Sequence, residues 1–318
     1  MKRFFIVLLK LTISLTLIVI FFAKFDLDVG RLFDEWRSVD RFQLLLAVIV
    51  FSISNLIGAA QWHLLLRAQG IVLRFPHVVA SYFTGLFFNN LLMGNIGGDV
   101  IRVYDIRRAA GDGSAGFAAT FLDRLLGLVV LLSFVMIAYP ITSDPIKARM
   151  GSSIVVVTAV MGIIMTLGFS RRVGRTVQSV TARWLPDRFT RTMNRVMTSL
   201  IRYRGKRRTM AVAALIAITV QILRIVSYFM VGLSLGMATP FRYFLVFIPL
   251  IAIVAAIPVS FGGLGVRENM TVLLFAGVGV PSTTAWSLGF LGYLVGIASS
   301  LPGVIAFNLR SLHHYETR

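Results

Sequence analysis

The sequence has 318 residues, of which 57% are hydrophobic and only 14% are charged, and its formal net charge is +19. Apolar runs long enough to span a bilayer recur from end to end, which excludes a separate soluble domain and predicts one all-α integral membrane domain over residues 1–318. Basic cytoplasmic loops explain the excess of Lys and Arg, so we expect no nucleic-acid partner. The chain has no cysteine, and none of its histidines has a metal-ligand spacing, so we expect neither a metal nor another cofactor.

The first apolar segment, residues 4–23, follows a basic start. It is too long for a signal peptide and has no small-residue cleavage site, which predicts a retained anchor. Together with this anchor, we expect about eight membrane-embedded segments. The others are 42–66, 78–93, 117–139, 152–169, 210–236, 243–257 and 286–307, with a shorter apolar piece at 267–280.

Two of these segments break at glycine pairs. Segment 78–93 runs into Gly97-Gly98, and segment 243–257 runs into Gly262-Gly263. Irregular backbone is tolerated in a bilayer only where protein or a cavity surrounds it. We therefore expect both segments to be re-entrant hairpins. Eight plain crossings with the N-terminus outside also leave most Lys and Arg residues inside, so charge alone does not separate the two arrangements.

The two breaks share the pattern Gly-Gly-x-x-x-Arg, 165 positions apart. Each lies between two spans, which predicts two repeats, about 42–139 and about 210–308, joined by the span 152–169 and a basic loop, 170–210. With re-entrant hairpins, the first break enters from inside and the second from outside, so the repeats are inverted. Transporters built from inverted repeats bind their substrate at the repeat interface. The same arrangement places both termini and the basic loop in the cytoplasm.

Several charged residues lie in or beside apolar segments, where each costs about 2.5–3.5 kcal/mol on insertion scales. After each glycine pair a half-helix can begin, with free amide groups and a positive dipole end. Arg102 and Arg267 lie about one turn into these helices. Two such ends suit an anionic group, especially a phosphate, which Arg binds with two hydrogen bonds.

The candidate substrate-binding set collects the polar and glycine residues of these regions. Its members are Asn89, Asn90, Gly97, Gly98, Asp99, Arg102, Asp123, Arg124, Arg224, Gly262, Gly263, Arg267 and Glu268. An alternative is a purely structural network without a ligand. That network would consist of salt bridges among Asp99, Arg102, Asp123, Arg124 and Glu268.

These motifs, in this order, resemble the flippase-like membrane domain of lysylphosphatidylglycerol synthases, which also occurs alone in bacteria and archaea. The resemblance covers about residues 5–310 and rests most on the second motif, Pro258-x-Ser260-x-Gly262-Gly263-Leu264-Gly265-x-Arg267-Glu268. Two features depart from the family pattern. Met93 stands where the first motif often has a proline, and the 318 residues contain no counterpart of the cytosolic aminoacyl-transferase domain.

The resemblance implies a multi-pass protein of the plasma (inner) membrane of a bacterium or archaeon that moves a lipid or lipid-linked headgroup between leaflets. The residues favour an anionic membrane lipid or a polyprenyl-phosphate-linked lipid as its partner. No catalytic residues are expected, because no histidine, paired-carboxylate metal motif or nucleotide loop lies near the charges. The alternatives are an intramembrane lipid-phosphate enzyme and a non-transporting partner of a separate lipid-modifying enzyme.

Overall fold

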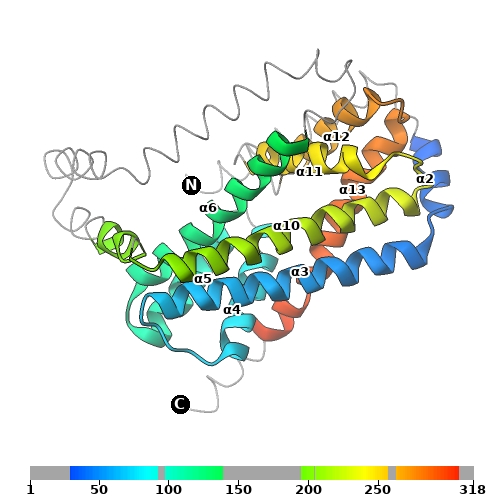
Figure 1. Cartoon of the computed structure of the whole chain (residues 1–318). Coiled ribbons are helices and arrows are strands. Elements are labelled where there is room, and N and C mark those ends of the chain that lie inside the picture. The colour runs from blue at the N-terminus through cyan, green and yellow to red at the C-terminus, as the bar shows by residue number, and fades with distance from the viewer. Residues whose placement is uncertain (1–28, 92–96, 139–194, 204, 257–262, 308–318) are drawn as a thin grey trace, which may run out of the picture.

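The computed structural model describes residues 29–91, 97–138, 195–203, 205–256 and 263–307, and these ranges contain helices and no strands (Figure 1). The all-α prediction is confirmed for this part of the chain. The predicted anchor 4–23, the predicted span 152–169, most of the basic loop, Gly262 and both termini lie outside the described residues.

The described helices fall into two series with the same order of lengths. The first series, after the short α2 (Val29–Arg37), comprises α3 (Arg41–Ala68), α4 (Phe75–Leu91), α5 (Gly97–Ala110) and α6 (Gly113–Ala138). The second comprises α10 (Arg207–Ser234), α11 (Phe241–Ala255), α12 (Val266–Ala276) and α13 (Ser282–Ser300). Each series runs long, short, short, long, with a break between its two short helices.

Four described helices are long and apolar enough to cross a membrane. They are α3, α6, α10 and the α13 segment, which extends as Ser282–Phe307. The short helices α4, α5, α11 and α12 have 17, 14, 15 and 11 residues. At 1.5 Å per residue they measure roughly 16–26 Å, less than the hydrocarbon core of about 30 Å. None of the four can therefore cross a bilayer core alone as a straight helix.

Helices α4 and α5 form a tight antiparallel hairpin. Ser81 Oγ in α4 donates a 2.9 Å hydrogen bond to Asp105 Oδ2 in α5. One turn closer to the break, a Cβ atom added to Gly98 would lie 1.7 Å from the carbonyl oxygen of Gly85. Only glycine at position 98 allows the two backbones to approach so closely. The first glycine pair therefore allows the close packing of α4 against α5, and it also lies at the break between these two helices.

The second break depends on backbone conformation. Gly263 and Gly265 both have φ of +81°, a region that residues with a Cβ rarely adopt. Gly265 is the N-cap of α12, and the Glu268 side chain turns back to accept a hydrogen bond from its backbone N–H at 2.7 Å. The glycines let the chain enter α12 directly after the break.

The two 28-residue helices α3 and α10 lie side by side and antiparallel (Figure 1). At one end, Asp40 N donates to Ser234 O at 3.0 Å. At the other end, the buried phenol of Tyr203, just before α10, donates to Leu65 O at 2.9 Å. Burial raises the pKa of Tyr203 to about 12, so this phenol stays protonated as a donor. Because α4 follows α3 and α11 follows α10, the two series leave this helix pair at opposite ends.

Two buried clusters hold the series together. Trp62 and Tyr82 belong to a cluster with residues from α3, α4, α5, α6 and α10. In the other cluster, the ring centroid of Phe275 lies 5.0 Å from those of both Phe244 and Phe247. Large apolar side chains also point outward along α3, such as Ile49 and Ile53. An outward apolar surface of this kind suits contact with lipid chains.

The two ends of the α3–α10 pair differ in charge. One end carries nine exposed basic residues and two acids, and the other carries four basic and three acidic residues within the described ranges. The basic end comprises Arg67, Arg74, Arg107, Arg108, Arg195, Arg202, Lys206, Arg207 and Arg208 with Asp105 and Asp112. The opposite end comprises Arg31, Arg37, Arg41 and Arg242 with Asp34, Glu35 and Asp40.

Candidate functional site

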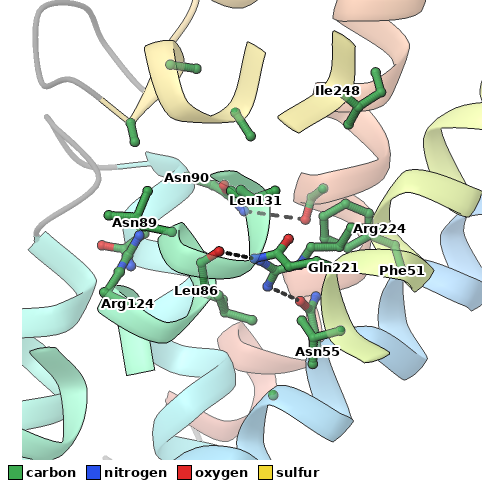
Figure 2. A pocket seen from close by; sticks show the side chains of 18 of the residues that line it. Phe51, Asn55, Leu86, Asn89, Asn90, Arg124, Leu131, Gln221, Arg224 and Ile248 are labelled. Carbon is green, nitrogen blue, oxygen red and sulfur yellow. Dashed lines mark hydrogen bonds between the residues drawn. The ribbon is translucent and has the colours of Figure 1, made fainter. Parts of the chain in front are cut away.

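A cavity of about 310 Å³ lies between the two series of helices. Its wall includes residues from α3, α4, α5, α6, α10, α11, α12 and α13 (Figure 2). Seven residues of the predicted set reach this wall although they come from distant parts of the sequence. They are Asn89, Asn90, Arg102, Asp123, Arg124, Arg224 and Arg267.

Arg102 is almost completely buried, with 2% of its side chain exposed. Its guanidinium lies between two aromatic rings, with Cζ 4.2 Å from the Trp62 centroid and 4.4 Å from the Tyr82 centroid. Nη2 bonds Asp123 Oδ2 at 3.1 Å, and Nη1 lies 3.6 Å from Asp99 Oδ1. The buried Nε of Arg102 has no hydrogen-bond partner among the described residues, but two carboxylates neutralise its charge and two rings enclose it, which is the setting of a structural cation.

Asp99 links this cation to a second one. Its two carboxylate oxygens accept hydrogen bonds from Arg124 Nε at 2.8 Å and Arg124 Nη2 at 3.1 Å, a bidentate pair. The Arg124 side chain is 42% exposed and lines the cavity. Together with Arg102 and Asp123, these residues form a cluster of two cations and two anions, which we call the acid-paired cluster.

The acid-paired cluster contains four of the five residues of the network considered as an alternative. The fifth, Glu268, lies elsewhere and caps its own helix through the amide of Gly265. On the first series, Asn89 Oδ1 accepts a 2.8 Å hydrogen bond from the amide of Gly98. At the start of each half-helix, a side chain therefore already accepts a hydrogen bond from one backbone amide, that of Gly98 or that of Gly265. Gly97 begins α5 and Gly263 precedes α12, and neither is on the cavity wall.

Arg224 and Arg267 differ from the acid-paired cluster. Among the described residues, neither guanidinium has a carboxylate within 4.0 Å. Arg224 makes a long 3.5 Å contact from Nη2 to Asn55 Oδ1, and its buried Nε has no hydrogen-bond partner in the described ranges. Figure 2 shows Arg224 pointing toward Asn55, with Arg124 on the opposite side of the cavity.

Arg267 enters the cavity from α12. Its Cζ lies 5.0 Å from the ring of Tyr293, whose hydroxyl donates to Asn90 O at 3.1 Å. The cavity wall and the adjoining Asp99 therefore hold four guanidiniums and two carboxylates. Two guanidiniums, those of Arg224 and Arg267, have no carboxylate within 4.0 Å among the described residues, and the buried carboxylate of Glu268 acts on Arg267 only from a longer distance. Such a site can bind an anion of one or two negative charges.

The comparison with known families supports a membrane protein. The family described as lysylphosphatidylglycerol synthase TM region matches residues 7–303. The chain belongs to this family. The UPF0104 membrane protein PH1989 of Pyrococcus horikoshii is 27% identical to it, with 98% of each chain aligned. A UPF0104 membrane protein of Methanothermobacter thermautotrophicus is 23% identical over 91% of this chain and 89% of the relative.

Membership of the lysylphosphatidylglycerol synthase TM-region family and the four long apolar helices make the chain a multi-pass integral membrane protein. Seven polar residues of its cavity are absent from the predicted set: Asn55, Gln61, Tyr82, Gln221, Tyr228, Tyr293 and Ser300. Asn55 and Gln61 lie inside the apolar segment 42–66, and this depth was a usable signal. Tyr293 gave no comparable signal, because tyrosine is common near membrane surfaces.

Proposed function

We propose that this chain moves an anionic lipid between the leaflets of the membrane and that Arg224 and Arg267 bind its phosphate. The lipid is a phospholipid or a polyprenyl-phosphate-linked lipid, and the protein is a translocase, not an enzyme. The observation that carries the proposal is the pair of cavity arginines without an acidic partner among the described residues. Keeping unpaired charges at this depth is costly unless a ligand or water compensates them.

The physical argument concerns the barrier to lipid movement. A bare phosphate crosses hydrocarbon extremely slowly, because the bilayer core offers no partner for its charge. Two guanidiniums on the wall of a protected cavity can replace its hydration with up to four charge-assisted hydrogen bonds. Acyl chains can remain in the lipid phase beside the outward apolar faces of the helices. The acid-paired cluster then serves as the fixed wall against which the phosphate is held.

We also propose that the two helix series are inverted repeats with the basic end in the cytoplasm. The matching order of helix lengths, the antiparallel α3–α10 pair and the opposite departure of the two hairpins support the inversion. The nine exposed cations at one end support the orientation, since cytoplasmic loops collect Lys and Arg. In this arrangement α4–α5 enters from inside, α11–α12 enters from outside, and the cavity lies at the repeat interface.

The test is a leaflet-exchange assay in liposomes with fluorescent phosphatidylglycerol. We expect wild-type protein to accelerate exchange at least tenfold over empty liposomes, and we expect the Arg224→Gln/Arg267→Gln double variant to lose this acceleration. Arg242→Gln is the matched control, because Arg242 is exposed and lies at the end of the helix pair, outside the cavity. Full activity of the folded double variant would overturn the site assignment.

A further inference from the structure

The neutral polar side chains on the cavity wall indicate which kind of lipid headgroup the cavity can bind. Gln61 is 3% exposed and reaches the wall, and its side chain makes no hydrogen bond within the described part of the chain. A buried amide normally has partners, because leaving it without them costs about 1–3 kcal/mol. Gln61 is therefore a group that a ligand can satisfy.

Other neutral groups on the wall also keep spare hydrogen-bonding capacity. Asn90 and Gln221 use their amide nitrogens on Ser300 Oγ at 3.2 Å and Gly127 O at 3.4 Å, which leaves their amide oxygens as acceptors. The Tyr228 ring packs against Gly292, where an added Cβ would lie 2.2 Å from Tyr228 Cε1. Amide oxygens and tyrosine rings at one site match a ligand with several hydroxyl groups, which can donate to the oxygens and lay its apolar faces on the rings.

The charges of the cavity argue against an ammonium-bearing headgroup. Asp123 is held by Arg102 at 3.1 Å, and Asp99 is held by Arg124 at 2.8 Å. An ammonium group would have to displace one of these guanidiniums to find a carboxylate. It would also approach Arg224 and Arg267, whose charges repel it. The cavity thus favours a headgroup without positive charge.

We propose that the cavity selects a phosphate esterified to a single sugar or polyol and rejects headgroups that carry an ammonium. This inference rests on the proposed function and names its substrate class. A volume of about 310 Å³ lies at the small end of ligand pockets, which suits one sugar or polyol unit and not an oligosaccharide. Arg224 and Arg267 bind the phosphate, and Gln61, Asn90 and Gln221 bind the hydroxyl groups.

The test compares exchange of four lipids with the same labelled acyl chains: phosphatidylinositol, phosphatidic acid, phosphatidylethanolamine and lysylphosphatidylglycerol. We expect phosphatidylinositol to exchange about tenfold faster than phosphatidic acid, because the inositol hydroxyl groups add hydrogen bonds that a bare phosphate lacks. We expect the two ammonium-bearing lipids to exchange at least tenfold more slowly than phosphatidylinositol. Equal rates for all four lipids would overturn the headgroup inference and leave the translocation proposal standing.

A Gln61→Leu variant keeps the volume of the side chain and removes its hydrogen bonds. We expect it to lower the ratio of the phosphatidylinositol rate to the phosphatidic acid rate by about tenfold. A ratio equal to that of the wild type would contradict the role of Gln61. Gln43→Leu is the matched control, because Gln43 lies on α3 outside the cavity wall.

A binding measurement separates failure of this inference from failure of translocation. Purified wild-type protein is heated in detergent with glucose 1-phosphate or with phosphoethanolamine. A rise in melting temperature with glucose 1-phosphate alone, together with no lipid exchange, would retain the headgroup class, reject translocation and indicate a free sugar phosphate as the ligand. An equal shift with both compounds, or no shift with either, would overturn the inference.

Discussion

Four arginines reach one cavity, and their partners divide them into two kinds. Arg102 and Arg124 are bound to aspartates, whereas Arg224 and Arg267 have none within 4.0 Å among the described residues. The position of these arginines in or beside apolar segments was readable from the sequence. Which arginine pairs with which acid was not readable, because the pairing depends on how distant helices pack. This is why Arg102 was expected to bind the anion, whereas the structure surrounds it with acids and aromatic rings.

Loss of Arg102 should destabilise the fold. In Arg102→Gln, Asp123 keeps its buried carboxylate without its 3.1 Å partner, and the slot between Trp62 and Tyr82 is poorly filled. We expect the free energy of unfolding to fall by about 3–5 kcal/mol, as for other broken buried ion pairs. Chemical unfolding in detergent measures this loss. Adding Asp123→Asn should recover part of it, and strictly additive losses in the double variant would contradict the pairing.

Loss of Arg224 or Arg267 should leave stability almost unchanged. Neither side chain has an acidic partner to leave unpaired among the described residues, so Arg224→Gln and Arg267→Gln should each change the free energy of unfolding by less than about 1 kcal/mol. The same unfolding measurement applies, with Arg242→Gln as the reference. A loss as large as that of Arg102→Gln would show that these arginines are structural and would remove the reason for assigning them to a ligand.

At the scale of helices, the break positions were predictable and their packing was not. Glycine pairs in apolar segments indicated two interruptions, and the structure describes short helices on both sides of each. The close contact of α4 with α5 involves Gly85, which carried no signal because a lone glycine in an apolar segment is common. The pattern Gly292-x-x-x-Gly296 is typical of a helix-packing face, yet Gly292 packs against Tyr228 whereas an added Cβ at Gly296 meets no atom within 4 Å.

Substitution of Gly98 tests the α4–α5 contact. A Cβ at this position would lie 1.7 Å from Gly85 O, so Gly98→Ala must push the two helices apart and disturb Arg102 between them. We expect a loss of several kcal/mol, of order 3 or more. Gly296→Ala is the matched control, because the space around it is open and it should cost less than about 1 kcal/mol. Equal melting temperatures for the two variants would contradict the hairpin geometry.

At the scale of the whole molecule, the sequence indicated a single membrane domain with two related halves. The family match over residues 7–303 and the four long apolar helices agree with the membrane domain. The count of about eight segments stays a prediction, since the segments 4–23 and 152–169 lie outside the described residues. Orientation could not be fixed from the loop charges alone, because two arrangements gave similar distributions. Nine exposed cations gather at one end of the α3–α10 pair, and this supports placing that end in the cytoplasm, because cytoplasmic loops collect Lys and Arg.

Orientation can be tested with single cysteines, because the chain has none of its own. Ser38→Cys lies at the less basic end of the helix pair, and Arg108→Cys lies at the basic end, and both positions are exposed. We expect a membrane-impermeant maleimide to label Ser38→Cys in intact cells and to label Arg108→Cys only after permeabilisation. The reverse pattern would place the basic end outside and contradict the proposed topology.

The central claim is that a positive charge at the cavity arginines carries the lipid phosphate. The measurement that tests it most directly is charge rescue of Arg267→Cys in the leaflet-exchange assay. We expect exchange to be lost in this variant, to return after modification with an aminoethyl methanethiosulfonate, which attaches an ammonium group, and to stay lost after modification with the uncharged methyl reagent. Exchange at the wild-type rate in unmodified Arg267→Cys, or equal recovery with both reagents, would contradict the claim.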